Sequence, residues 1–230
     1  SHDLALSNAE LQESAYAASH DLQEPVRTII GFAQLLERRY RGQMGSEADE
    51  FIGFIVEGAQ RMRRQINDLL TYARLGRDGV TFEAVDMNDV AAEVRRALHG
   101  AIEASGAQLA IEPLPVVRGN SDALVRLLQN LLGNAIKFAK PGQVPQVRVS
   151  AVRSGQWAEF QVADQGIGIA PEYHQRVFRM FERLHARGEY DGSGVGLAIC
   201  RKVIELHGGR IWLDSHPGQG CTIFFLLPLA

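Results

Sequence analysis

The sequence predicts two domains of different class: a helical hairpin that forms a four-helix bundle as a dimer, followed by an α/β sandwich of the α+β type. Two observations lead to this prediction. Within the first 77 residues, apolar side chains recur at spacings of three and four over two long stretches. After a glycine-containing run at residues 76–79, short alternating segments typical of strands are interrupted by helical patterns. We therefore expect domains at residues 1–77 and 78–230.

The first predicted helix runs from about residue 4 to residue 40. Its apolar stripe follows the 100° step of an α-helix and consists of Ala15, Ala18, Leu22, Val26, Ile29, Ala33 and Leu36. Pro25 interrupts the helix, because proline cannot donate to the carbonyl four residues earlier. A short loop at residues 40–46 ends at Ser46, whose hydroxyl predicts an N-cap for the next helix.

The second predicted helix extends to about residue 75. Its stripe consists of Ile52, Ile55, Ala59, Met62, Ile66, Leu69 and Ala73. Two antiparallel helices with one apolar stripe each cannot enclose a core, whereas two copies of the hairpin can. The sequence therefore predicts a homodimer. Packing of the hairpin against the second domain is the alternative.

The second domain is expected to combine strands and helices. Strands are predicted at residues 81–85, 107–111, 116–117, 146–152, 157–164, 210–215 and 221–227, and helices at residues 87–105, 121–139, 171–178 and 194–207. Asp86 and Asn120 stand directly before two of these helices and predict N-caps. Pro171 opens a short helix, where its missing N–H is not needed.

Composition excludes several classes of protein. Hydrophobic residues make up 46% and charged residues 22% of the chain, as in globular domains. A formal net charge of −3 gives no electrostatic reason to expect nucleic-acid binding. No apolar run approaches the ~20 residues of a membrane span, so we expect no membrane insertion of this segment. The two cysteines, Cys200 and Cys221, are expected to be buried and reduced, which favours a cytoplasmic location.

One predicted helix carries an unusual polar row. Asn130, Asn134 and Lys137 are spaced i, i+4 and i+7, opposite a leucine-rich face. A solvated helix face favours Glu, Lys and Arg, whereas asparagine is a poor helix former. Asparagine oxygens suit Mg²⁺, and a lysine suits a phosphate. The row therefore indicates ligand binding.

Two glycine-rich segments also indicate ligand binding, but more weakly than the polar row. Asp164, Gly166 and Gly168 follow a predicted strand, where glycine lets backbone approach a ligand and a carboxylate can accept from an exocyclic amine. Gly192, Gly194 and Gly196 lead through Leu197 into a helix, as in a phosphate cradle. Taken alone, the first segment is better explained as a glycine-rich turn, and the three glycines of the second are a weak signal.

His20 lies about 160° from the apolar stripe of the first helix, so its imidazole is expected to face water. In isolation, an exposed histidine is more often a solvated residue than a reactive one. Asp21 follows directly and can hold the second ring N–H.

These segments in this order resemble the Bergerat-type (GHKL) ATP-binding domain shared by histidine kinases, type II topoisomerases, mismatch-repair ATPases and a heat-shock chaperone. The row from Asn130 to Phe138 resembles the histidine-kinase N box, and the two glycine segments resemble its glycine boxes. Residues 19–25 (Ser-His-Asp-Leu-Gln-Glu-Pro) resemble the H box. Nearly the whole chain is thus similar to the catalytic core of a sensor histidine kinase, closest to the phytochrome- and PAS-linked subgroup.

The resemblance implies roles for particular residues. His20 would be phosphorylated by ATP, assisted by Asp21, Lys137 and Arg183. Asn130 would ligate Mg²⁺, Asn134 and Lys137 would contact phosphates, and Asp164 would read the adenine amine. The implied ATP-binding residues are completed by Phe138, Gly166, Gly168, Arg183, Gly192, Gly194, Gly196 and Leu197. The implied partners are a second copy, a response regulator receiver domain and an upstream sensory domain.

Two other functions would also use an ATP-binding domain. A pseudokinase scaffold would bind ATP and a regulator without turnover, but it would be expected to lack His20, Asn130 or a glycine of the second glycine-rich segment. A topoisomerase-like or chaperone ATPase would leave the helix bearing His20 unexplained.

Overall fold

The computed structural model describes residues 22–75, 81–182, 184 and 193–230. The chain separates into two compact units, Ser1–Arg74 and Leu75–Ala230. His20, Asp21 and the run at residues 76–79 lie outside the described residues. Among those described, no helix is long and apolar enough to cross a membrane.

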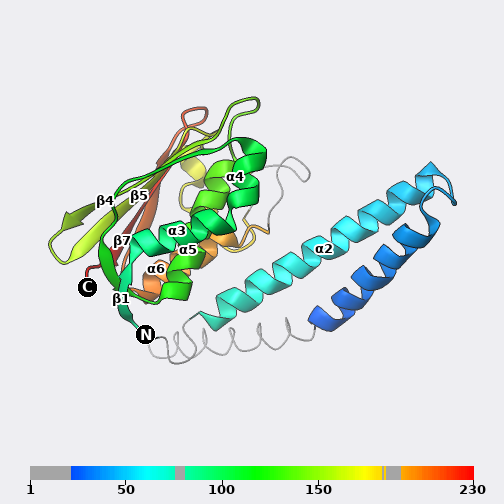
Figure 1. The fold of residues 1–230 in the computed structure, drawn as a ribbon, viewed down its shortest axis with the longest axis horizontal. Helices are drawn as coiled ribbons and strands as arrows, with labels where there is room; N and C mark the ends of the chain where they lie inside the picture. Colours follow the sequence, from blue (N-terminus) through cyan, green and yellow to red (C-terminus); the bar gives the residue numbers. More distant parts are fainter. Residues whose placement is uncertain (1–21, 76–80, 183, 185–192) are drawn as a thin grey trace. The chain divides into compact units, whose positions relative to one another are not determined.

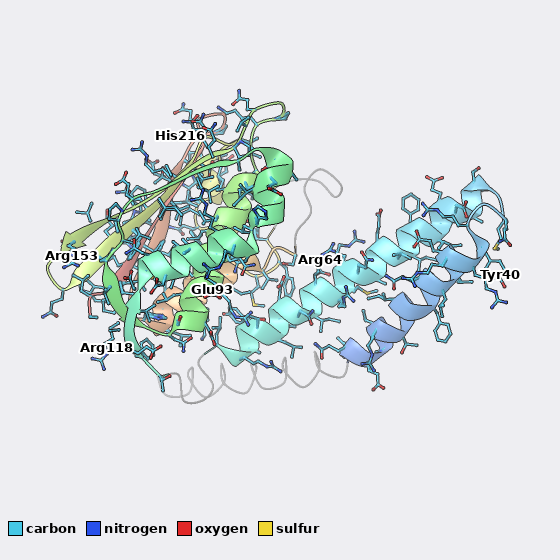
Figure 2. The ribbon with its side chains drawn as sticks, in the orientation of Figure 1. Tyr40, Arg64, Glu93, Arg118, Arg153 and His216 are labelled. Atoms are coloured by element: carbon cyan, nitrogen blue, oxygen red, sulfur yellow. The ribbon has the colours of Figure 1, made fainter. Side chains whose placement is uncertain are left out.

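The first unit is a helical hairpin (Figure 1). Residues 22–40 are helical, and helix α2 spans Ser46–Arg74. The helix continues without a break through Pro25, in the first described turn. Tyr40 lies at the loop end of the hairpin (Figure 2). The loop is fastened by Asp49, whose Oδ2 accepts from the Gly42 N–H at 2.9 Å. Ser46 is the first residue of α2 and not its N-cap, because the Gly45 carbonyl already accepts from Asp49 N–H.

The core of the hairpin contains Val26, Ala33, Ile52 and Ala59 from the predicted stripes, whereas Ile30 and Val56 take the places predicted for Ile29 and Ile55. Val26, Ile30 and Ala59 form one buried cluster, and a second contains Ala33, Ile52 and Val56. The predicted stripe residues Ile29 and Ile55 remain 45% and 53% exposed in the single chain. One step along a helix rotates a side chain by 100°, so neighbouring positions share the apolar surface of a wide stripe. Each helix therefore has apolar side chains on two adjacent faces, and only one face meets the other helix of the hairpin.

The second unit is a two-layer α+β sandwich (Figure 1). Its main sheet has the order β2-β4-β5-β7-β6, with strands Gln108–Ile111, Gln146–Ser154, Trp157–Asp164, Cys221–Pro228 and Ile211–Ser215 in that order. The pair β2–β4 is parallel, and the other neighbours are antiparallel. A small antiparallel sheet pairs β1 (Glu83–Asp86) with β3 (Val116–Gly119).

Helices cover one face of the main sheet. They are α3 (Met87–Ala97), α4 (His99–Ser105), α5 (Ser121–Lys137) and α6 (Gly196–Leu206), with short 3-10 turns η1 (Pro171–Tyr173) and η2 (Arg176–Phe178). Fully buried Phe160 and Phe225 stack on the inner face of the sheet, with ring centroids 5.0 Å apart. The free cysteines Cys200 and Cys221 are buried, as expected, and burial raises the pKa of the Cys221 thiol to about 12. The mixture of sheet and helices agrees with the predicted fold class.

His207 joins three elements of this unit. Its buried ring accepts from the Asn120 N–H through Nε2 at 3.1 Å and donates to the Val203 carbonyl through Nδ1 at 2.7 Å. Phe82 packs edge-on against the same ring. This arrangement requires the neutral imidazole. Burial lowers the pKa of His207, and the hydrogen bond to Val203 opposes that effect only partly.

We expect the stability of the protein to fall in mild acid because of His207. The pKa of His207 is lower in the folded than in the unfolded protein. The contribution of His207 to the free energy of unfolding is therefore complete above the unfolded pKa of 6.5, and it is lost as the pH falls through the folded pKa. Urea unfolding between pH 8 and pH 5 should show this loss. His207→Gln, which cannot titrate, should remove this part of the pH dependence. A control variant, His99→Gln on exposed α4, should keep the wild-type slope. Equal slopes for wild type and His207→Gln would contradict the prediction.

Candidate nucleotide site

Helix α5 is the centre of the candidate site. Asn120 caps it by accepting from the Ala123 N–H at 3.0 Å, as predicted. One side of α5 is buried and consists of Ala123, Leu124, Leu127, Leu128, Leu131, Leu132, Ala135 and Ile136. Asn130, Asn134 and Lys137 are half-buried and lie outside this apolar row. The packing of the leucine face therefore fixes the direction of the polar row.

Asp164 ends strand β5, and its carboxylate is held by backbone. Oδ1 accepts from the Gly166 N–H at 2.8 Å and from the Cys221 N–H at 3.2 Å. Burial raises the pKa of Asp164, while these two donors act in the opposite direction. Within the described residues, both recorded hydrogen bonds end on Oδ1. Oδ2 is thus the oxygen placed to accept from a ligand.

The loop after Asp164 packs against the C-terminal end of α5. The Ile167 N–H donates to the Phe138 carbonyl at 3.0 Å, and a side chain at position 166 would collide with the same carbonyl. Gly168 has φ of 73° and lies against the His216 carbonyl, so this position requires glycine. The two glycines let the loop pass between α5 and the turn after β6. This brings Asp164 and the end of the asparagine row into one region.

The second glycine segment meets α5 at Asn130. A Cβ atom at Gly196 would lie 3.1 Å from Asn130 Oδ1, so the backbone at the start of α6 passes closely over this amide. Gly194, with φ of 76°, lies against the backbone of Phe181 and Glu182. Leu197 follows in α6 and is half-buried. The second glycine segment is therefore fixed to α5 at Gly196.

The structure thus brings together three motifs that are far apart in the sequence. Asn130 meets Gly196, and Phe138 meets Gly166 beside Asp164. This region lies at the end of the sheet marked by His216, opposite the end marked by Arg153 (Figure 2). Lys137 Nζ lies 4.0 Å from the centre of the Phe138 ring. His20, Asp21, Arg183 and Gly192 lie outside the described residues.

Sequence reasoning missed the residues that support the Asp164 loop from behind. The Ser215 hydroxyl accepts a hydrogen bond from the Ile169 N–H, 46 positions away in the sequence. His174 Nε2 forms a hydrogen bond with the Ser215 carbonyl, 41 positions away. The ring nitrogens of His174 and His207 both form hydrogen bonds to backbone carbonyls, so both residues have structural roles. No periodicity indicates such contacts, because they join segments at unrelated positions.

Two family models match the chain. Residues 10–78 match the His Kinase A (phospho-acceptor) domain. Residues 119–230 match the histidine kinase-, DNA gyrase B-, and HSP90-like ATPase domain. The two matches follow each other in the order expected from the sequence.

Individual relatives cover nearly the whole chain. Cyanobacterial phytochrome A from Nostoc sp. is 44% identical over 99% of the chain, and the phytochrome-like protein Cph1 from Synechocystis sp. is 41% identical over 99%. The chain spans 30% of the length of each.

A solved structure gives the same correspondence. Full-length ShkA in complex with AMPPNP matches 95% of this chain and 46% of its own with a TM-score of 0.72 at 28% identity. The chain therefore belongs to the histidine kinases and is their catalytic core, a phospho-acceptor domain followed by an ATPase domain.

Proposed function

We propose that the chain transfers the γ-phosphoryl group of ATP to His20 and then to an aspartate of a response regulator. The observation that supports this most is the convergence of Asn130, Asp164 and Gly196 around α5. Residues 1–77 would serve as the dimerisation and phosphoacceptor domain, and residues 78–230 as the catalytic ATP-binding domain.

Nucleotide binding is assigned to the three converging motifs. Asp164 Oδ2 accepts a hydrogen bond from the adenine amine, because Oδ1 already accepts from the two backbone donors. Phe138, Gly166 and Gly168 form the surroundings of this carboxylate. Asn134 and Lys137 contact phosphate oxygens, since an amide and an ammonium can both donate to them. The backbone of Gly192, Gly194, Gly196 and Leu197 offers N–H groups to the phosphates at the start of α6.

The residues present fit a Mg²⁺ ion held mainly by the nucleotide. Among the described residues there is no group of three or more His, Cys, Asp or Glu side chains that could hold a metal. Mg²⁺ commonly has one or two protein ligands and takes the rest from phosphates and water. Asn130 Oδ1, at the crossing with Gly196, would be the protein ligand. Bound Mg²⁺ would offset negative charge on the transferring group.

His20 supplies the nucleophile. Its neutral ring nitrogen forms a bond to the γ-phosphorus as the bond from phosphorus to the β–γ bridging oxygen breaks, leaving ADP and phosphohistidine. An imidazole of ordinary pKa is mostly neutral at pH 7. Asp21 holds the other ring N–H and stabilises the positive charge that develops on the ring. Lys137 and Arg183 offset charge on the phosphoryl group.

Regulation and location follow from the same proposal. The chain matches 30% of the length of two phytochromes, which supports an upstream sensory domain in the full protein. The phospho-acceptor domain supports a receiver domain as partner. Two buried, free cysteines support a cytoplasmic location.

The function is tested with γ-labelled ATP and Mg²⁺. We expect label on the protein that is lost in acid and retained in base, as for a phosphorus–nitrogen bond. Rapid release of inorganic phosphate without labelled protein would instead indicate an ATPase, and ATP binding without either reaction would indicate a scaffold.

We propose that the hairpin forms a homodimer through its exposed apolar face. In the single chain, large apolar side chains are exposed along both helices. They are Leu22, Ile29, Phe32, Leu35, Leu36, Phe51, Phe54, Ile55 and Met62. Exposed apolar side chains gathered along an element indicate an interaction surface. A second hairpin would cover it as a four-helix bundle.

Light scattering tests the dimer. The full chain is expected to have twice the mass of a monomer, and residues 1–77 alone should dimerise while residues 78–230 remain monomeric. Ile55→Asp should shift the full chain to monomer, because burying an unpaired carboxylate is costly. Glu57→Asp, at an exposed position already charged, is the control. A dimeric C-terminal piece with a monomeric hairpin would contradict the proposal.

A further inference from the structure

Ser215 has a buried hydroxyl group that links the loop after Asp164 to the β6–β7 turn. It is the last residue of β6 and is 4% exposed. Its Oγ accepts from the Ile169 N–H at 2.8 Å and donates to the Gly220 carbonyl at 2.6 Å. The single proton of the hydroxyl is therefore used within the protein. Ser215 fixes the distal end of the loop to the β6–β7 turn.

His174 secures the same junction from the other side. Its Nε2 lies 3.0 Å from the Ser215 carbonyl oxygen and 3.2 Å from the Ile169 carbonyl oxygen. Both carbonyls can only accept, so Nε2 carries the proton and donates to both. His174 follows η1, and it thus ties this segment to the loop and to β6 at once.

The β6–β7 turn and the first residue of β7 also hold the segment from Asp164 to Ile167. The Gly218 N–H donates to the Ile167 carbonyl at 2.7 Å, and the Cys221 N–H donates to Asp164 Oδ1. Gly220 packs against the Asp164 backbone so closely that a side chain would not fit. The orientation of the Asp164 carboxylate therefore depends on the position of this turn. Ser215 and His174 fix the position of the turn relative to the loop after Asp164.

We propose that Ser215 and His174 are positioning residues for nucleotide binding. They do not touch the nucleotide, and they act by keeping Asp164 Oδ2 in the orientation that accepts the adenine amine. This inference rests on the proposed ATP-binding function. Its physical basis is preorganisation: a loop already held in its binding conformation loses less entropy when the ligand binds.

Calorimetric titration of the full chain with ATP tests the inference. Ser215→Ala leaves the Ile169 N–H without its acceptor, and His174→Leu removes the shared donor. We expect each change to weaken ATP binding about tenfold. Initial labelling rates should recover at saturating ATP, because neither residue belongs to the phosphoryl-transfer machinery. Exposed Ser154→Ala and His99→Leu are matched controls and should bind like the wild type.

Two further measurements separate positioning from general destabilisation. In the protein without nucleotide, the amides of Gly166 and Ile169 should exchange hydrogen faster in both variants, while the amide of Phe160 in the core keeps its protection. His174→Gln retains an N–H donor at similar reach and should restore affinity.

The outcomes are distinguishable. A wild-type chain that binds no ATP overturns the proposed function itself. If the wild type binds ATP but Ser215→Ala and His174→Leu bind it equally well, the positioning role is wrong. The same conclusion follows if His174→Gln binds as weakly as His174→Leu. Should Ser215→Ala unfold at the assay temperature, the comparison of the two His174 variants decides.

Discussion

His20→Ala is expected to abolish labelling of the protein by γ-labelled ATP, because the substitution removes the nucleophile that we propose for the reaction. We expect the amount of label on the variant to fall below the detection limit, since the alanine side chain has no atom that can accept a phosphoryl group. ATP affinity should stay at the wild-type value, because the nucleotide is assigned to the other domain. Acid-stable and base-stable fractions of the label, measured after quenching, check the result.

The matched control for this variant is His99→Ala. His99 is an exposed histidine on α4, 3.4 Å from Glu103, and it has no assigned role in transfer. Its variant should label like the wild type. Undiminished labelling of His20→Ala would show that another residue is the acceptor.

Asp164→Asn is expected to weaken ATP binding by at least about a hundredfold, even though the side chains have the same shape. The two backbone N–H groups require an oxygen at the Oδ1 position. Asparagine can satisfy them only by placing its NH₂ group where Oδ2 was. A donor would then face the donor amine of adenine. The alternative rotamer offers oxygen to adenine but sets NH₂ against two backbone donors, so neither arrangement is satisfied. Titration calorimetry with ATP measures the loss.

Asp214→Asn serves as the control for the carboxylate. Asp214 lies on β6, two strands away from Asp164, and its side chain is exposed. This variant should bind ATP normally and should unfold at the same urea concentration as the wild type. Wild-type affinity in Asp164→Asn would remove Asp164 from the adenine site.

Features set by neighbouring residues were predictable from the sequence. The N-caps at Asp86 and Asn120 are confirmed, since each accepts from a backbone N–H two or three residues later. Strand β5 has the predicted bounds. The leucine row of α5 is buried as its spacing predicts, because a helix presents residues three and four apart on one face.

Features set by tertiary packing were not predictable. The helix expected over residues 87–105 is divided at Leu98, whose ψ of 5° lies outside the helical range, and both parts contact α5. The helix expected over residues 171–178 is two separate 3-10 turns. The parallel pairing of β2 with β4 has no sequence signature, because it depends on the path of α5 between them. Which glycine approaches which residue of α5 likewise emerges only when the fold is complete.

The contact between Gly194 and the backbone of Phe181 and Glu182 has a consequence for how such a chain can change in length. Phe181, which has φ of 61°, and Gly194 are thirteen positions apart in the sequence, but their backbones lie directly beside each other. The two ends of the intervening segment are thus fixed by the rest of the domain, whatever lies between them. Closing a loop costs only about 0.6 kcal/mol for each doubling of its length. Changes in the length of the chain between these two anchors should therefore leave the fold of the sheet and α5 undisturbed, provided that Arg183 and Gly192 keep their places for nucleotide binding and transfer.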